Sequence, residues 1–152
     1  VLKEAQRAGG DIRGKQSASL LVVAAEATSA PWNDRLIDLR VEDHDNPIQE
    51  VERLLKVFRA YEHMNKGDYY VEKNEMKNAM DEYNQAQKMF PENLEMRYWT
   101  AITLANGGEI SKASAMLQGI YKKDPNWREL TRRLPKAGVL MVSEKDLKDL
   151  LQ

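Results

Sequence analysis

The first third of the chain carries two short segments of the kind that form β-strands. Ser19 to Ala25 is a continuous apolar run with β-branched residues, which is typical of a strand covered on both faces. From Leu36 to Val41 apolar and polar residues alternate with a period of two. We therefore predict two strands joined by a loop around residues 28–34. Because two strands alone are marginal in water, we expect them to pair with further strands or to lie against helices.

The rest of the pattern is helical. Residues 2–8 resemble the end of a helix that Gly9 and Gly10 would stop. Asn46 and Pro47 form a good helix start, since asparagine can cap and proline is preset for the first helical position. Apolar residues then recur at helical spacing from residue 48 through residue 64, with no breaker before Gly67. We expect this one helix to join the two parts of the chain without a flexible linker.

The second half contains an internal repeat of 34 residues. The offset aligns four positions of one segment with four of the next: Ala79, Tyr83, Ala86 and Pro91 with Ala113, Leu117, Ile120 and Pro125. It also aligns Gly67 with Ala101. Thirty-four is the tetratricopeptide period, and the residues resemble two tetratricopeptide repeats, in which small side chains let antiparallel helices approach closely. The alternative is a generic array of helical hairpins with a coincidental period, which gives nearly the same fold without a binding groove.

Two repeats leave an uncovered surface at each end, because such arrays are stabilised by contacts between neighbouring units. We expect the joining helix to cover the front of the array. Residues from Trp127 to Leu151 are expected to form a short helical cap at the back. Within that cap, Ser143 to Asp146 has the pattern of a helix N-terminal capping box, and Pro135 to Gly138 is typical of a turn.

Composition excludes several classes of function. The 152 residues carry a net charge of −1, with no cysteine and two histidines. A near-neutral chain has no electrostatic footprint for nucleic acid. No stretch approaches the roughly 18 apolar residues of a membrane span. Disulfides and cysteine-ligated zinc are excluded, whereas the compartment stays open, and we predict neither a metal ion nor another cofactor.

Three local clusters allow a chemical and a structural interpretation. His44 lies among acids in residues 42–45, which would suit a cation or a solvated loop before a helix. Residues 9–17 contain the glycine spacing of a phosphate loop, but in a helix-loop-strand context that is the reverse of the one it needs. Trp127 lies within a basic run at residues 122–136, which would suit an anionic cell-wall glycan or the solvated side of an end helix.

Residues 1 to about 60 resemble the closing section of a known family. The matching segments are Arg13 to Ala18, Leu20 to Val23, Trp32 to Arg35, and Asp38 to Glu50. They are similar to an uncharacterised prokaryotic family with an N-terminal-nucleophile-hydrolase-like fold (domain of unknown function family 1028). In that family a helical region labelled as putatively peptidoglycan-binding often follows, and residues 124–135 look like its ending.

The resemblance implies the remnant of a four-layer αββα sandwich and the hydrolysis of amide bonds by an N-terminal nucleophile. Val1 has no hydroxyl or thiol, so we expect no such nucleophile at this terminus and no enzyme activity of this chain alone. The complete parent protein would be the amide hydrolase. Four polar residues could then contribute to its pocket: Arg13, Gln16, Asp34 and Arg40. The structural alternative is that the two arginines pair with Asp34, Asp38 or Asp43 and fix the loops.

Together these patterns predict an α+β chain that is mainly α. Residues 1–60 would be the closing segment of the hydrolase-like domain, and residues 61–152 a tetratricopeptide-like array with a C-terminal cap. The predicted function is a non-catalytic module that docks a peptide or a partner protein. The alternatives are part of an amide hydrolase or a module that binds peptidoglycan.

The first helix of each tetratricopeptide unit lines the concave surface, which here would mix aromatic and acidic side chains and so suit a basic or amphipathic peptide. The candidate groove residues are Tyr61, Met64, Asp68, Glu72, Glu95, Tyr98, Ile102 and Asn106. If the two strands have no further neighbours, their exposed edges would favour pairing with a second copy of the chain.

Overall fold

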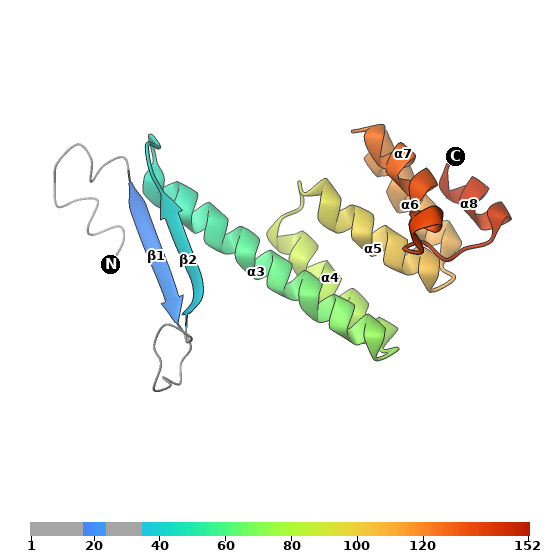
Figure 1. Cartoon of the computed structure of the whole chain (residues 1–152), viewed down its shortest axis with the longest axis horizontal. Coiled ribbons are helices and arrows are strands. Elements are labelled where there is room, and N and C mark those ends of the chain that lie inside the picture. The colour runs from blue at the N-terminus through green and yellow to red at the C-terminus, as the bar shows by residue number, and fades with distance from the viewer. Residues whose placement is uncertain (1–16, 24–34) are drawn as a thin grey trace. The chain divides into compact units, whose positions relative to one another are not determined.

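A computed structural model describes residues 17–23 and 35–152 (Figure 1). The described part is mainly helical, with one two-stranded antiparallel sheet. The chain divides into two compact units, residues 1–58 and residues 59–152, and the division falls inside a helix. The helix expected over residues 2–8 and the loop expected over residues 28–34 lie outside the described residues.

The sheet consists of β1 (Ala18–Val23) and β2 (Arg35–Val41), close to the two predicted strands. Ser19 lies opposite Arg40 and Leu21 opposite Asp38, so these four residues share one face. The alternate positions, including Leu20 and its neighbours on β2, form a second face that is apolar. The first face is polar because the alternation of β2 places its charged residues there.

Helix α3 (Pro47–Glu72) follows β2 and is continuous over 26 residues, as predicted. Pro47 occupies the first helical position, where its missing N–H costs nothing. Gly67 does not interrupt the helix, because it lies where α4 (Met76–Met89) packs closely on α3. A Cβ built on Gly67 would come 2.9 Å from Cζ of Tyr83 and closer still to two other ring carbons.

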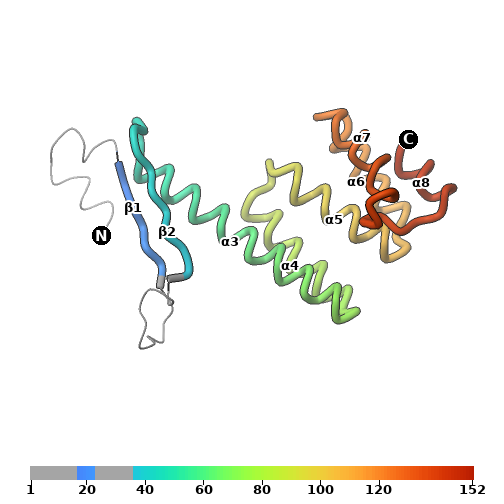
Figure 2. The backbone as a smooth tube through the Cα atoms, viewed as in Figure 1, coloured from blue at the N-terminus to red at the C-terminus, as the bar shows by residue number. Residues whose placement is uncertain are grey.

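The next hairpin is built from α5 (Leu94–Asn106) and α6 (Ile110–Tyr121). Figure 2 shows these two helices following α3 and α4 along the backbone. The ends of the first helices of the two hairpins repeat at the predicted offset: α3 ends at Glu72 and α5 ends 34 residues later, at Asn106. Ala79 and Ala113 are both fully buried, and both belong to the second helix of a hairpin. The two alanines therefore have matching surroundings.

The turns inside the two hairpins have the same hydrogen bonds. In the first turn the N–H of Glu75 donates to the carbonyl of Tyr70, and in the second Glu109 donates to Leu104, both at 2.9 Å. Before each of these donors stands a residue with positive φ, Asn74 at 59° and Gly108 at 83°. This is a Schellman-type helix end, for which asparagine and glycine are suited because they tolerate the left-handed conformation.

The remaining helices are α7 (Asn126–Arg133), the 3-10 helix η1 (Leu134–Ala137) and α8 (Glu144–Leu150). Gly138, with a φ of 71°, ends η1 with the same turn geometry, since the N–H of Val139 donates to Leu134. Ser143 caps α8 by accepting a hydrogen bond from the N–H of Asp146. The predicted cap at Ser143 and the predicted turn at residues 135–138 are confirmed, and the carboxylate of Asp146 accepts a hydrogen bond from the hydroxyl of Ser143 at 2.7 Å.

Side chains from all helices of the second unit form its core. One cluster joins α3, α4 and α5 around Ala79, Tyr83 and Met96. Another joins α5 and α6 to the C-terminal helices, with Tyr98, Leu117 and Leu150 among its fully buried members. The C-terminal residues thus cover the end of the second hairpin. Among the helices that the structure describes, none combines the length and apolar character that crossing a bilayer requires.

Candidate functional site

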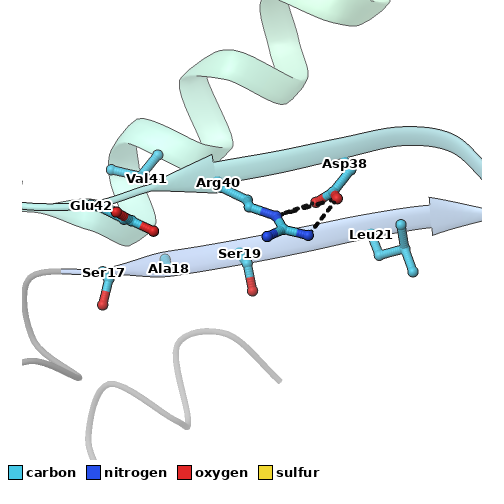
Figure 3. Close-up of a pocket in the computed structure, with 8 residues that line it drawn as sticks. All are labelled: Ser17, Ala18, Ser19, Leu21, Asp38, Arg40, Val41 and Glu42. Carbon is cyan, nitrogen blue, oxygen red and sulfur yellow. Dashed lines mark hydrogen bonds and ion pairs between the residues drawn. The ribbon is translucent and has the colours of Figure 1, made fainter.

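The polar face of the sheet lines a hollow of about 510 Å³ (Figure 3). Both strands contribute to it, together with the residues that flank them. The lining residues are Ser17, Ala18, Ser19, Leu21, Asp38, Arg40, Val41 and Glu42. Because residues opposite each other on antiparallel strands share a face, the sequence alternation places two hydroxyls beside three charged groups.

Arg40 is the one predicted pocket residue that the structure describes, and it lines this hollow. Its Nη2 lies 2.9 Å from Oδ2 of Asp38, and its Nε donates to the same carboxylate at 3.2 and 3.3 Å. This hydrogen bond raises the pKa of Arg40 above its ordinary value. Arg40 thus pairs with Asp38, one of the acids that the structural alternative named, within β2, whereas Arg13, Gln16 and Asp34 lie outside the described residues.

The hollow holds polar groups without an activated nucleophile. Its described lining contains two serines but no histidine and no lysine that could serve as their base. The carboxylate of Asp38 is engaged by Arg40 in the geometry of a paired charge. What the described groups can do is bind a polar ligand through hydroxyls and one guanidinium. Sequence reasoning missed Ser17 and Ser19, although the period-two pattern of β1 places them on the same face as Arg40.

Leu21 and Leu36 are exposed large apolar side chains on this two-stranded sheet. Exposed apolar residues on a sheet are a common feature of surfaces that pair with another segment. Pairing of a second copy along a strand edge stays a prediction.

The predicted groove residues of the second unit divide into exposed and buried sets. Tyr61 is partly buried, and Asp68, Glu72 and Glu95 are exposed. The hydroxyl of Tyr61 donates to Glu95 at 2.6 Å, which joins α3 to α5 on this side. The hydroxyl of Tyr83 donates to Asp68, also at 2.6 Å. A tyrosine hydroxyl therefore holds one acidic group on α3 and one on α5.

These hydrogen bonds shift the titration of the tyrosines. The bond to Glu95, followed by partial burial, raises the pKa of Tyr61 above its ordinary value. Burial, followed by the bond to Asp68, raises the pKa of Tyr83 well above its usual range. Both phenols therefore stay protonated and act as hydrogen-bond donors to the carboxylates throughout the neutral range.

The expectation that Met64, Tyr98 and Ile102 line an open groove is wrong, because all three are buried. Tyr98 is fully buried: its ring packs on Trp127 with centroids 4.5 Å apart, and its hydroxyl lies 3.0 Å from that of Thr131. The C-terminal helices cover the part of α5 that the repeat pattern had left open.

Asn106 is exposed but already engaged. Its amide donates to the carbonyl of Val139, and its carbonyl oxygen accepts from the N–H of Met141. It fixes the segment before α8. The part of the predicted surface that remains open is therefore the acidic one.

The other clusters have structural roles. The Nδ1 of His44 accepts a hydrogen bond from the N–H of Asn46 at 2.9 Å, just before α3 begins. Within residues 17–23 and 35–152 no three histidine or acidic side chains are grouped so that they could hold a metal ion. In the basic run, Arg132 and Arg133 both pair with Glu129.

The N-terminal segment of the chain matches the sequence model of a protein family. Residues 1–51, which include both strands and the start of α3, match a family of unknown function (DUF1028). No curated protein and no solved structure matches the chain. The match covers 51 of the 152 residues and includes the lining of the hollow on the sheet. The part of the resemblance that concerns the family itself is thus confirmed: residues 1–51 are similar to a family of unknown function.

Proposed function

We propose that residues 59–152 form a tetratricopeptide-like module that docks a cationic peptide segment of a partner protein. The repetition of buried alanines, helix ends and Schellman turns at 34 residues supports the repeat. In such arrays the first helices of successive hairpins form a common surface. Here those helices are the second half of α3 together with α5.

One observation carries the proposal: two of the three carboxylates are oriented by tyrosine hydroxyls, and none of the three has a cationic partner among the described residues. Tyrosine hydroxyls hold Asp68 and Glu95, and Glu72 lies one turn beyond Asp68 on the exposed side of α3. None of the three makes an ion pair with another described residue. Acids that are already held in place lose less conformational entropy when a ligand binds.

The chemistry of this surface indicates a basic peptide. Three uncompensated negative charges attract lysine or arginine side chains, and the partly buried ring of Tyr61 offers an apolar contact beside them. A helical or extended segment that alternates basic and apolar residues would use both features.

The direct test is fluorescence anisotropy with a labelled peptide of alternating lysine and leucine, compared with a glutamate and leucine peptide. We expect the full chain to bind the first peptide, and the affinity to fall as salt screens the charges. The double variant Glu72→Lys/Glu95→Lys should weaken binding by about tenfold or more, since it reverses two charges at the surface.

The matched control is Asp81→Lys/Glu92→Lys, which makes the same change in net charge at two exposed acids of other segments. We expect it to retain most of the affinity. Equal loss in both variants would mean that only the net charge of the chain matters. Unchanged binding in the Glu72/Glu95 variant would remove this surface from consideration.

We also propose that residues 1–58 are the closing part of an N-terminal-nucleophile-type amide hydrolase, a αββα sandwich in its complete form. Support comes from the resemblance of residues 13–50 to that family and from the polar hollow on the sheet, which would supply pocket groups. Intact-mass measurement and N-terminal sequencing of the native protein test this. An upstream segment that begins with serine, threonine or cysteine is expected, and a gene that encodes nothing upstream of Val1 would contradict it.

Binding to cell-wall glycan is not favoured by any described contact. Trp127, the expected sugar platform, packs on Tyr98 and is partly buried. Sedimentation with purified peptidoglycan remains the experiment for that alternative, and binding that weakens as salt is raised would revive it, because attraction of the basic run to an anionic polymer is screened by salt.

A further inference from the structure

A second hollow, of about 500 Å³, lies between α4 and α5, and its lining has an unusual charge. Asn84, Gln87 and Lys88 contribute from one face of α4, Pro91 from the following turn, and Arg97 from α5. Two cations and two amides thus line it, and no carboxylate does. Its volume is within the range of roughly 300–1,000 Å³ that is usual for small-ligand sites.

The two cations have no acidic partner. Neither Lys88 nor Arg97 forms an ion pair with any residue that the structure describes. Glu92, the acid nearest to Lys88 along the chain, lies 4.0 Å from the amino group of Lys123. Glu95, the acid nearest to Arg97, accepts the hydrogen bond of Tyr61. The positive charge of the hollow is therefore not neutralised by the described part of the protein.

The repeat explains why Arg97 has no partner. The residue 34 positions earlier is His63, whose Nδ1 lies 2.5 Å from the carboxylate of Glu82. The position equivalent to Glu82 in the next hairpin is Met116. In the second hairpin the thioether of Met116 thus stands where the first has the carboxylate of Glu82. The permanently charged guanidinium of Arg97 stands where the first has His63.

The same location one repeat further on is filled. There Tyr121 stands at the position of Gln87 and Thr131 at the position of Arg97. Tyr121 is buried, its hydroxyl donates to that of Thr131 at 2.8 Å, and the guanidinium of Arg128 lies 5.2 Å from its ring centroid. The open, cationic hollow is therefore a property of one junction and not of the repeat in general.

Nearby groups hold the polar side chains of the hollow in position. The amide of Gln87 donates to the buried hydroxyl of Thr100 at 3.1 Å, and that hydroxyl donates to the carbonyl of Met96. The guanidinium of Arg97 extends toward Gly119 of α6. A Cβ built on Gly119 would lie 3.9 Å from Nη2 of Arg97. Gln87 is thus hydrogen-bonded to α5, and the guanidinium of Arg97 lies beside α6.

We propose that this hollow binds a small anion that carries phosphate or carboxylate oxygens, through Arg97 and Lys88. A guanidinium presents a fork of N–H donors that matches such groups in a bidentate manner, and a lysine adds a compact second charge. Asn84 and Gln87 supply neutral hydrogen bonds to further oxygens. The site is separate from the acidic surface of the proposed docking function and does not depend on it.

The test is isothermal titration of the full chain with inorganic phosphate and with citrate, at constant ionic strength set with chloride. The two probes distinguish a compact tetrahedral anion from a larger polycarboxylate. We expect saturable binding of at least one of them. Absence of binding of both would overturn the proposal.

Variants then locate the site. Arg97→Gln and, separately, the exposed Lys88→Gln should each weaken binding by about tenfold or more, because each removes a charged donor. Lys136→Gln, the same change at an exposed lysine elsewhere, should leave it within about twofold. An equal loss in the Lys136 variant would show general charge attraction and would overturn the proposal.

A filling variant guards against misfolding as the cause. Gln87→Tyr/Arg97→Thr reproduces the residues of the filled junction, and we expect it to keep its thermal midpoint while losing anion binding. Retained binding in a folded filling variant would contradict the proposed location.

Discussion

The substitution Gly67→Ala tests the close approach of α3 and α4 directly. In an exposed helix interior this change would stabilise the protein by about 1 kcal/mol, because alanine has the higher helix propensity. Here the added Cβ would overlap the ring of Tyr83, which is nearly fully buried and whose hydroxyl is bonded to Asp68. The ring therefore cannot move away without losing packing and a hydrogen bond.

The magnitude follows from two opposing effects. Overpacking a core of this kind costs typically 1–3 kcal/mol, and an overlap with three carbons of one ring belongs at the upper end. After subtraction of the gain in helix propensity, we expect Gly67→Ala to lower the free energy of unfolding by about 2 kcal/mol. Denaturant unfolding followed by tryptophan fluorescence measures this, since Trp99 and Trp127 both lie in the second unit.

The repeat supplies the rescue. Thirty-four residues later the pair Gly67 and Tyr83 becomes Ala101 and Leu117, both fully buried. In the background Tyr83→Leu, Gly67→Ala should therefore change sign and stabilise by about 1 kcal/mol, because the new methyl group fills space that the ring has vacated.

Gly119→Ala is the matched control. It makes the same change inside α6, where an added Cβ meets nothing closer than 3.9 Å, and we expect a gain of up to about 1 kcal/mol. If Gly67→Ala stabilises the protein as Gly119→Ala does, the reasoning about helix approach is refuted. The same holds if Gly67→Ala costs as much with leucine at position 83 as with tyrosine.

Three further predictions concern the C-terminal helices. Thr131→Val should lower the free energy of unfolding by about 2–4 kcal/mol, because it leaves the buried hydroxyls of Tyr98 and Tyr121 without their hydrogen-bond partner. Thr131→Ser should lower it much less, and equal losses in the two variants would contradict this. Burial raises the pKa of Tyr98 to about 12. The neutral phenol therefore contributes about 3 kcal/mol to the free energy of unfolding below about pH 10, and this contribution is lost between about pH 10 and 12. A denaturation midpoint that is unchanged at about pH 11.5 would disprove this prediction. Ser143→Ala should lower stability by about 1 kcal/mol through loss of the α8 cap to Asp146, and a change below about 0.3 kcal/mol would show that the cap contributes little.

Local patterns predicted the elements because local interactions determine them. The alternation in Leu36 to Val41 fixes which side chains of β2 face one way, and the structure pairs the strand accordingly. The 34-residue offset located equivalent positions in both hairpins, such as the buried Ala79 and Ala113. These features depend on residues near each other in the chain.

The candidate site was harder to predict because it depends on which segment covers which. Tyr98 and Ile102 occupy positions that a repeat pattern assigns to an open surface, but the C-terminal helices pack over them. A single sequence does not specify where a capping segment lies. The sequence analysis did not single out Lys88 or Arg97, and the signal that could have identified them was the break in the repeat at residues 121 and 131.

The central claim is that the second unit docks a cationic peptide on the acidic surface of α3 and α5. The most direct measurement is a two-dimensional amide NMR titration of the full chain with the lysine and leucine peptide. We expect the shifted resonances to come mainly from residues 61–72 and 94–106, and to saturate together. Shifts confined to other segments would contradict this expectation. So would the absence of shifts in both the full chain and the Glu72→Lys/Glu95→Lys variant at the same peptide concentration.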